Sequence, residues 1–107
     1  MALPDAPFVV LDRDQRAALM KERVVPELAP IFQRRDPARY AAFGCATCHG
    51  RGAASGRYEM PNPQLVHVGE SASFDRRAVE WMAAEVTPAM TRLVGATIEC
   101  RTCHVEE

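Results

Sequence analysis

The sequence predicts an all-α fold: a small helical domain with long loops that spans residues 1–107. Two stretches of the chain carry apolar residues at helical spacing, which is typical of amphipathic helices. In each stretch a proline falls at the same place in the pattern, and a Cys-x-x-Cys-His run follows. These features indicate two weakly repeated helix–linker–Cys-x-x-Cys-His units, at about residues 12–68 and about 69–107.

The first predicted helix begins at Asp12 or Asp14, because an aspartate side chain can accept hydrogen bonds from the free N–H groups of a helix start. Residues 1–11, which precede it, are expected to form an extended arm. Pro26 lies inside the helical pattern and should kink the helix or start a new turn, since proline has no N–H donor. The predicted apolar face consists of Met20, Val24, Leu28 and Ile31.

A short second helix is predicted over residues 38–43, because Asp36-Pro37 joins a capping residue to a proline at the first helical position. The composition then changes to a glycine-rich loop over residues 50–56. Residues 58–63 are expected to be extended, because each proline disfavours helix in the residue before it.

The third predicted helix runs over residues 74–86, with Ser71 or Ser73 as its cap and Asp75 near its positive end. Pro88 is expected to interrupt it, as Pro26 interrupts the first helix. The predicted buried stripe consists of Phe74, Ala78, Met82, Val86 and Met90.

The two helical stretches align with each other without gaps. The aligned runs are Met20-x-x-x-Val24-x-Pro26-x-Leu28-x-x-Ile31 and Met82-x-x-x-Val86-x-Pro88-x-Met90-x-x-Leu93. The chain therefore has the pattern of an internal duplication.

Each unit contains a motif of known chemistry, Cys-x-x-Cys-His, which is the attachment signature of c-type haem. Two thiols bond to the porphyrin edge, and the adjacent histidine is placed to bind the iron. The two motifs contain all four cysteines and two of the three histidines. We therefore expect two haem c groups, attached at Cys45, Cys48, Cys100 and Cys103 and bound by His49 and His104.

Other cysteine chemistry explains the motifs less completely. A tetrathiolate zinc or iron–sulfur site would use both cysteine pairs but would give the two histidines no role. A thioredoxin-like dithiol needs a strand–helix–strand frame, which the pattern does not show. Two structural disulfides would also leave the repeated histidine unexplained. Haem is the interpretation that gives a role to every cysteine and to the histidine of both motifs.

A helix that bears a methionine, followed by a turn and Cys-x-x-Cys-His, is similar to the haem-binding unit of the multihaem cytochrome subunit of photosynthetic reaction centres and its small exported relatives. The ending Ile98–Val105 resembles that family's motif, whereas Phe43–Gly50 and Met60-Pro61 resemble ordinary small c-type cytochromes. The resemblance covers roughly residues 15–60 and 74–105. It implies that a helical methionine supplies the second axial ligand of each iron.

The residues leave several candidates for that ligand: Met20, Met60, Met82, Met90 and His67. A methionine sulfur is soft and uncharged and raises the haem potential, which suits an electron carrier. Only Met20 and Met82 occupy equivalent places in the repeat, so we expect Met20 on the first iron and Met82 on the second. Met60 and Met90 are the respective rivals, and ordinary core packing is the alternative for all four methionines.

Several further residues lie near the motifs. The aromatic residues Phe32, Tyr40, Phe43, Phe74 and Trp81 can pack on porphyrin or form an ordinary core. Arg51, Arg57 and Arg101 can pair with haem propionates or remain solvated.

The leading functional hypothesis is electron transfer between redox partner proteins, without an enzymatic reaction. The alternatives are a haem-based sensor or small-molecule enzyme with one open iron position, and a zinc-binding structural module. A net charge of −1 indicates no nucleic-acid partner, and the composition indicates no membrane span.

The expected location is the periplasm or another exported compartment, because covalent haem attachment in bacteria takes place outside the cytoplasm. The start of the sequence, Met1-Ala2-Leu3-Pro4-Asp5, has no basic segment followed by an apolar run. We therefore expect the signal segment to lie outside this sequence.

Overall fold

The computed structural model describes residues 6–50, 52–53, 56, 58, 60–65 and 75–105. The helices in this range are η1 (Phe8–Val10), α1 (Arg13–Leu19), η2 (Met20–Val24), α2 (Val25–Arg35), α3 (Cys45–His49), α4 (Arg76–Trp81), η4 (Met82–Val86), α5 (Thr87–Val94) and α6 (Cys100–Cys103). The predicted all-α class is confirmed. None of these helices is both long enough and apolar enough to cross a membrane.

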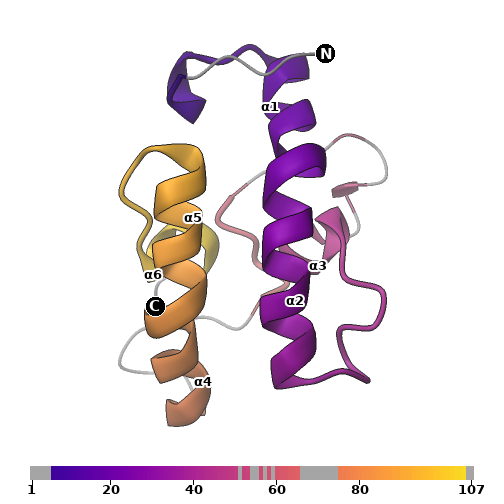
Figure 1. Ribbon diagram of the computed structural model, residues 1–107. Coiled ribbons are helices and arrows are strands. Elements are labelled where there is room, and N and C mark those ends of the chain that lie inside the picture. Colours follow the sequence, from indigo (N-terminus) through magenta and orange to yellow (C-terminus); the bar gives the residue numbers. More distant parts are fainter. Residues whose placement is uncertain are drawn as a thin grey trace.

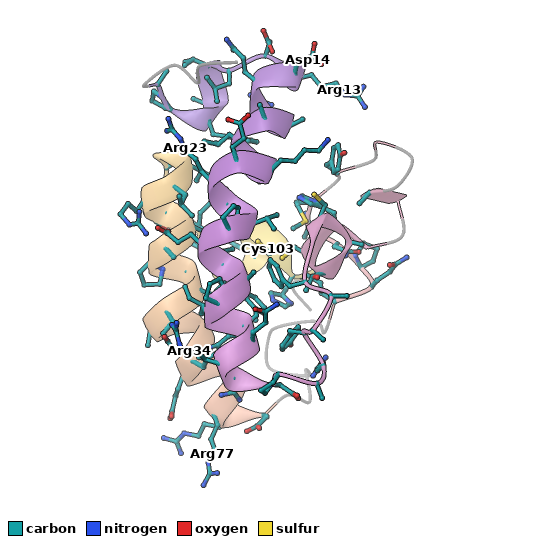
Figure 2. All side chains as sticks on the ribbon, turned by 45° about the vertical axis from the view of Figure 1, so that its right-hand side comes forward. Arg13, Asp14, Arg23, Arg34, Arg77 and Cys103 are labelled. Carbon is teal, nitrogen blue, oxygen red and sulfur yellow. The ribbon has the colours of Figure 1, made fainter. Side chains whose placement is uncertain are left out.

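Two long helices lie side by side and antiparallel (Figure 1). The first is continuous through α1, η2 and α2, and the second through α4, η4 and α5. Two ion pairs connect them in antiparallel order: Glu27 with Arg92, and Arg34 with Glu85 at 3.8 Å. The short helices α3 and α6 lie on the same side of this pair, and Figure 2 shows Cys103 of α6 behind the first long helix.

Each long helix contains one π-helical turn, and the two turns occupy aligned positions of the repeat. In η2 the N–H of Val25 donates to the carbonyl of Met20, and in η4 the N–H of Thr87 donates to the carbonyl of Met82. A proline is the next residue in both cases. Its ring would clash with the carbonyl four residues earlier in an α-helix, and the wider π-turn gives it room. The helices therefore do not break at these prolines but continue through them.

The hydrophobic core lies between the two long helices. Its buried members are Leu11, Leu19, Val24, Leu28, Phe32, Trp81 and Ala89. The predicted face of the first helix packs on the core: Val24 and Leu28 are buried, and Met20 and Ile31 are half-buried against them. Leu19 and Phe32 are buried as well and were not predicted as members of this face. The five-residue step from Leu19 to Val24 contains the extra residue of the π-turn, which a uniform helical period does not anticipate.

The face predicted for the second helix differs in the same way. Trp81 and Ala89 are buried there, while Ala78, Met82, Val86 and Met90 are half-buried. Trp81 aligns in the repeat with Leu19, so both units bury the residue directly before the π-turn.

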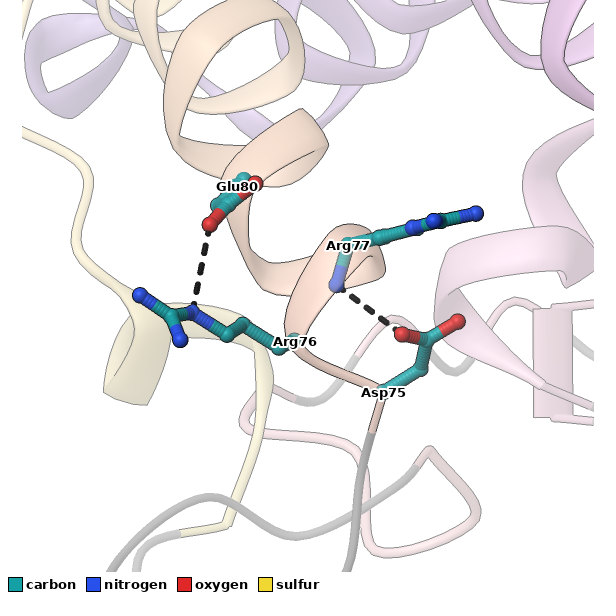
Figure 3. Close-up of polar contacts among 4 residues, drawn as sticks. All are labelled: Asp75, Arg76, Arg77 and Glu80. Atoms are coloured by element: carbon teal, nitrogen blue, oxygen red, sulfur yellow. Dashed lines mark hydrogen bonds and ion pairs between the residues drawn. The ribbon is translucent and has the colours of Figure 1, made fainter.

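The caps of the long helices are aspartates. Asp12 accepts from the N–H of Gln15, whose side chain accepts in return from the Asp12 N–H, which confirms one of the two predicted caps. Asp75 caps α4 by accepting from the N–H of Arg77 at 2.9 Å, beside an Arg76–Glu80 ion pair of 3.3 Å (Figure 3). The predicted caps Ser71 and Ser73, like Phe74, lie outside the described residues.

Two smaller predictions are wrong. Part of the expected extended arm, Phe8–Val10, forms a 3₁₀ turn, and the Arg16 side chain donates to the carbonyls of Phe8 and Val9. Residues 38–43 form turns and no helix. The Tyr40 carbonyl accepts there from the Gln33 side chain and from the Phe43 N–H, so it does not serve as the acceptor of a following helical turn.

We expect Leu28→Ala to lower the free energy of unfolding by about 2–5 kcal/mol, because Leu28 is the most deeply buried core side chain and its loss leaves a cavity. The measurement is urea unfolding followed by circular dichroism. Val9→Ala is the control; Val9 is 70% exposed, and its loss should change stability by less than about 0.5 kcal/mol. Equal effects of the two substitutions would contradict the described core.

Candidate functional site

Both Cys-x-x-Cys-His motifs form the same short helical turn. Helix α3 carries the first motif and α6 the second. In each turn the threonine between the cysteines accepts a hydrogen bond from the N–H of the residue before the turn. Thr47 Oγ1 accepts from the Gly44 N–H, and Thr102 Oγ1 accepts from the Glu99 N–H, both at 3.0 Å. This role of threonine was not predicted from the sequence. The signal was present, because the same residue type stands before the second cysteine of each motif.

The first motif is attached to the helix pair through aromatic rings. Phe32 of α2 lies 5.0 Å from the ring of Tyr40, 4.7 Å from Phe43 and 4.9 Å from Trp81, measured between ring centroids. Four of the five aromatic residues singled out from the sequence therefore form one cluster, and Phe74 lies outside the described residues. This cluster fixes the chain directly before Gly44, where the first motif begins.

The second motif follows α5 more directly. The Thr91 hydroxyl of α5 accepts from the Ile98 N–H at 3.1 Å, which holds the linker against the helix. Arg101 forms an ion pair with Glu99 at 2.9 Å and lies on the surface. The other two arginines considered for propionates, Arg51 and Arg57, lie outside the described residues.

Asn62 joins the two motifs to each other. Its side-chain Nδ2 donates to the carbonyl of Cys48 at 2.8 Å, and its backbone N–H donates to the carbonyl of Cys103 at 2.9 Å. Both acceptors belong to the second cysteine of their motif. Asn62 is 4% exposed and also forms a β-bridge with His104. Nothing in the sequence pattern pointed to this asparagine, which lies in the predicted extended loop between two prolines.

The histidine of the first motif is half-buried. Among the described residues, Nδ1 of His49 is buried without a hydrogen-bond partner, and the ring lies 5.3 Å from that of Tyr58. Burial lowers the pKa of His49, although an interaction with the Tyr58 backbone acts in the opposite direction. A neutral imidazole with an unused nitrogen is the form that binds a metal ion, so His49 fits the role of an iron ligand.

All four cysteines are free thiols. Burial, and then the neighbouring Cys103 and Cys45, raise the pKa of Cys48 to about 11. The pKa of Cys103 is raised as well, first by burial and then by Cys100. The Asn62 bonds to the carbonyls of Cys48 and Cys103 show that the two motifs are close neighbours. In the described part of the chain, no three His, Cys, Asp or Glu side chains are arranged to hold one metal ion.

Three of the candidate methionine ligands pack against the core, and the fourth lies in a loop. Met20 and Met82 are each the first residue of a π-turn, half-buried and packed against the core. Met90 packs against the same core, and Met60 is half-buried in the loop that precedes Asn62. His67 lies outside the described residues. The assignment of Met20 and Met82 to the two irons stays a prediction.

Gly50, which follows the first motif, has a φ of +75° and no room for a side chain. An added Cβ would lie 2.3 Å from Gln64 Oε1 and 3.1 Å from Asn62 Nδ2. We expect Gly50→Ala to lower the free energy of unfolding by about 1–3 kcal/mol from the backbone conformation, with the contacts adding to the loss.

Gly44→Ala is the matched control at the other end of the same turn. No atom lies within 4 Å of its added Cβ, and its backbone is extended. Its effect in urea unfolding should stay below about 1 kcal/mol. The described loop would be wrong if the alanine at position 44 destabilised the protein more than the one at position 50.

No protein-family model matches the sequence, and no curated protein or solved structure gives a match either.

Proposed function

We propose that this protein is a small dihaem c-type cytochrome that carries electrons between redox partner proteins. The observation that carries the proposal is the pair of matching Cys-x-Thr-Cys-His turns, which share one capping pattern and are joined through Asn62. These turns use all four cysteines and give both following histidines a role.

In this proposal each turn holds one haem c. Cys45 and Cys48 form the thioether bonds of the first group, and Cys100 and Cys103 those of the second. His49 and His104 are the proximal ligands, since adjacency to the second cysteine leaves them little freedom. The bound iron supplies one-electron chemistry, while the chain provides ligands, insulation and orientation.

The proposed distal ligands are Met20 and Met82. Two features support them over Met60 and Met90: their equivalent positions in the repeat and their location at the start of a π-turn. Such turns occur frequently at functional sites, where the extra residue reorients side chains relative to a regular helix. A thioether ligand also raises the reduction potential and leaves no open iron position, as an electron carrier requires.

The close approach of the two motifs supports electron transfer, because two haems attached at neighbouring turns would lie closer together than haems at separate sites. Asn62 contacts both turns through hydrogen bonds to Cys48 and Cys103, and Cys103 contributes to the raised pKa of Cys48. Two haems attached at neighbouring turns would exchange electrons within one molecule. We also propose that the protein is exported, because the covalent attachment of haem in bacteria takes place outside the cytoplasm.

When the protein is produced with an export signal and a haem-maturation system, its intact mass should exceed that of the chain by two haem groups. The double substitutions Cys45→Ala/Cys48→Ala and Cys100→Ala/Cys103→Ala should each reduce the added mass to one haem, because each removes one pair of attachment thiols. Intact mass and visible absorption provide the measurement.

The matched control is expression of the unchanged chain without the maturation system, which should give protein without the added mass. Colourless material containing zinc from the complete system would instead support the structural-module alternative. Carbon monoxide binding to the native reduced protein would support an open iron position, as in a sensor or enzyme.

Met20→Ala and Met82→Ala should each abolish the sulfur-to-iron absorption band of one haem, because alanine offers no ligand for the vacant position. Met60→Ala and Met90→Ala are the matched controls and should retain both bands. The assignment would be overturned by intact bands in both of the first two variants, and loss of a band in a control would identify the rival ligand.

A further inference from the structure

We infer that Asn62 is a positioning residue that holds the two haem-binding turns, and through them the two haems, in one fixed mutual orientation. This inference rests on the proposed function and adds to it, since electron exchange inside the molecule depends on how the two groups are oriented. It assigns a role to a residue outside both motifs.

The hydrogen bonds of Asn62 are directed at equivalent atoms of the two motifs. Its Nδ2 donates to the Cys48 carbonyl, and its backbone N–H donates to the Cys103 carbonyl. Each carbonyl belongs to the peptide unit directly before the motif's histidine. One residue thus fixes the backbone beside both predicted iron ligands, and a shift of Asn62 would move both turns relative to each other.

The side-chain amide is fixed in a single orientation. Oδ1 accepts from the Gln64 N–H at 3.0 Å, which leaves Nδ2 directed at the Cys48 carbonyl. A flipped amide would place two acceptors against each other and two donors against each other. Because the residue is 4% exposed, water does not readily replace these bonds, and losing one leaves a buried group unpaired.

The surroundings leave Asn62 little space to move. Gly50 passes so close that even a Cβ there would contact the Asn62 Nδ2 at 3.1 Å. On the other side the parallel bridge to His104 aligns the backbone of residue 62 with the second motif. Asn62 therefore lies between the ends of the two turns and contacts both.

Soret circular dichroism of the dihaem protein tests the inference, because two chromophores in a fixed mutual orientation give a two-signed couplet. The native protein should show this couplet. Asn62→Asp keeps the oxygen that faces Gln64 but replaces the donor to Cys48 with a second acceptor, and Asn62→Ala removes both side-chain bonds. Each variant should show a weaker couplet, since a lost hydrogen bond shifts the balance between held and released turns about fivefold toward the released form.

Asp75→Ala is the matched control for general destabilisation, because it removes one capping hydrogen bond at the start of α4 (Figure 3). It should keep the full couplet. All variants should keep two haems by mass and an unchanged far-ultraviolet spectrum, a combination that a merely structural role of Asn62 does not predict.

Two results would overturn the inference: a native dihaem protein without a couplet, or an undiminished couplet in Asn62→Asp and Asn62→Ala. A native protein without a couplet overturns the inference even if neither variant matures. Failure of the proposed function gives a different result, because the unchanged protein would then carry no haem mass.

Discussion

The aromatic contacts of Phe32 join the two long helices to each other and to the segment that leads into the first motif. This buried ring lies at the end of the first long helix, packs on Trp81 of the second, and also contacts Tyr40 and Phe43. The contact with Trp81 holds the two long helices together. The contacts with Tyr40 and Phe43 position the chain directly before the first motif. Without them, the segment before the first Cys-x-x-Cys-His turn would lose its aromatic packing against the helices and keep the Gln33–Tyr40 hydrogen bond to α2.

The sequence was sufficient to predict what depends on local pattern. Helical spacing and an Asp12 cap predicted the all-α class and the start of the first long helix, and these were correct. It was not sufficient where tertiary contacts decide. Residues 38–43 form turns because Tyr40 and Phe43 pack on Phe32, and no local propensity encodes that contact.

The candidate site divides in the same way. The motif residues follow from their spacing, whereas Asn62 does not, since its role depends on two turns that are far apart in sequence and adjacent in space. The burial of Leu19 and Trp81, directly before the π-turns, was not predicted from helical spacing, because a π-turn adds a residue that a constant helical period omits. Met20, Met82 and Met90 all pack against the core, and Met20 and Met82 differ from Met90 in that each begins a π-turn.

The two long helices, which carry aligned π-turns, pack side by side and antiparallel (Figure 1). Self-complementary packing of this kind is the usual geometry of a symmetric dimer. One unit alone would leave the apolar side of its long helix uncovered, and in this chain the other unit covers it. Because both units lie on one chain, this packing is unimolecular and does not depend on protein concentration, and the linkers before Cys45 and Cys100 can differ in length.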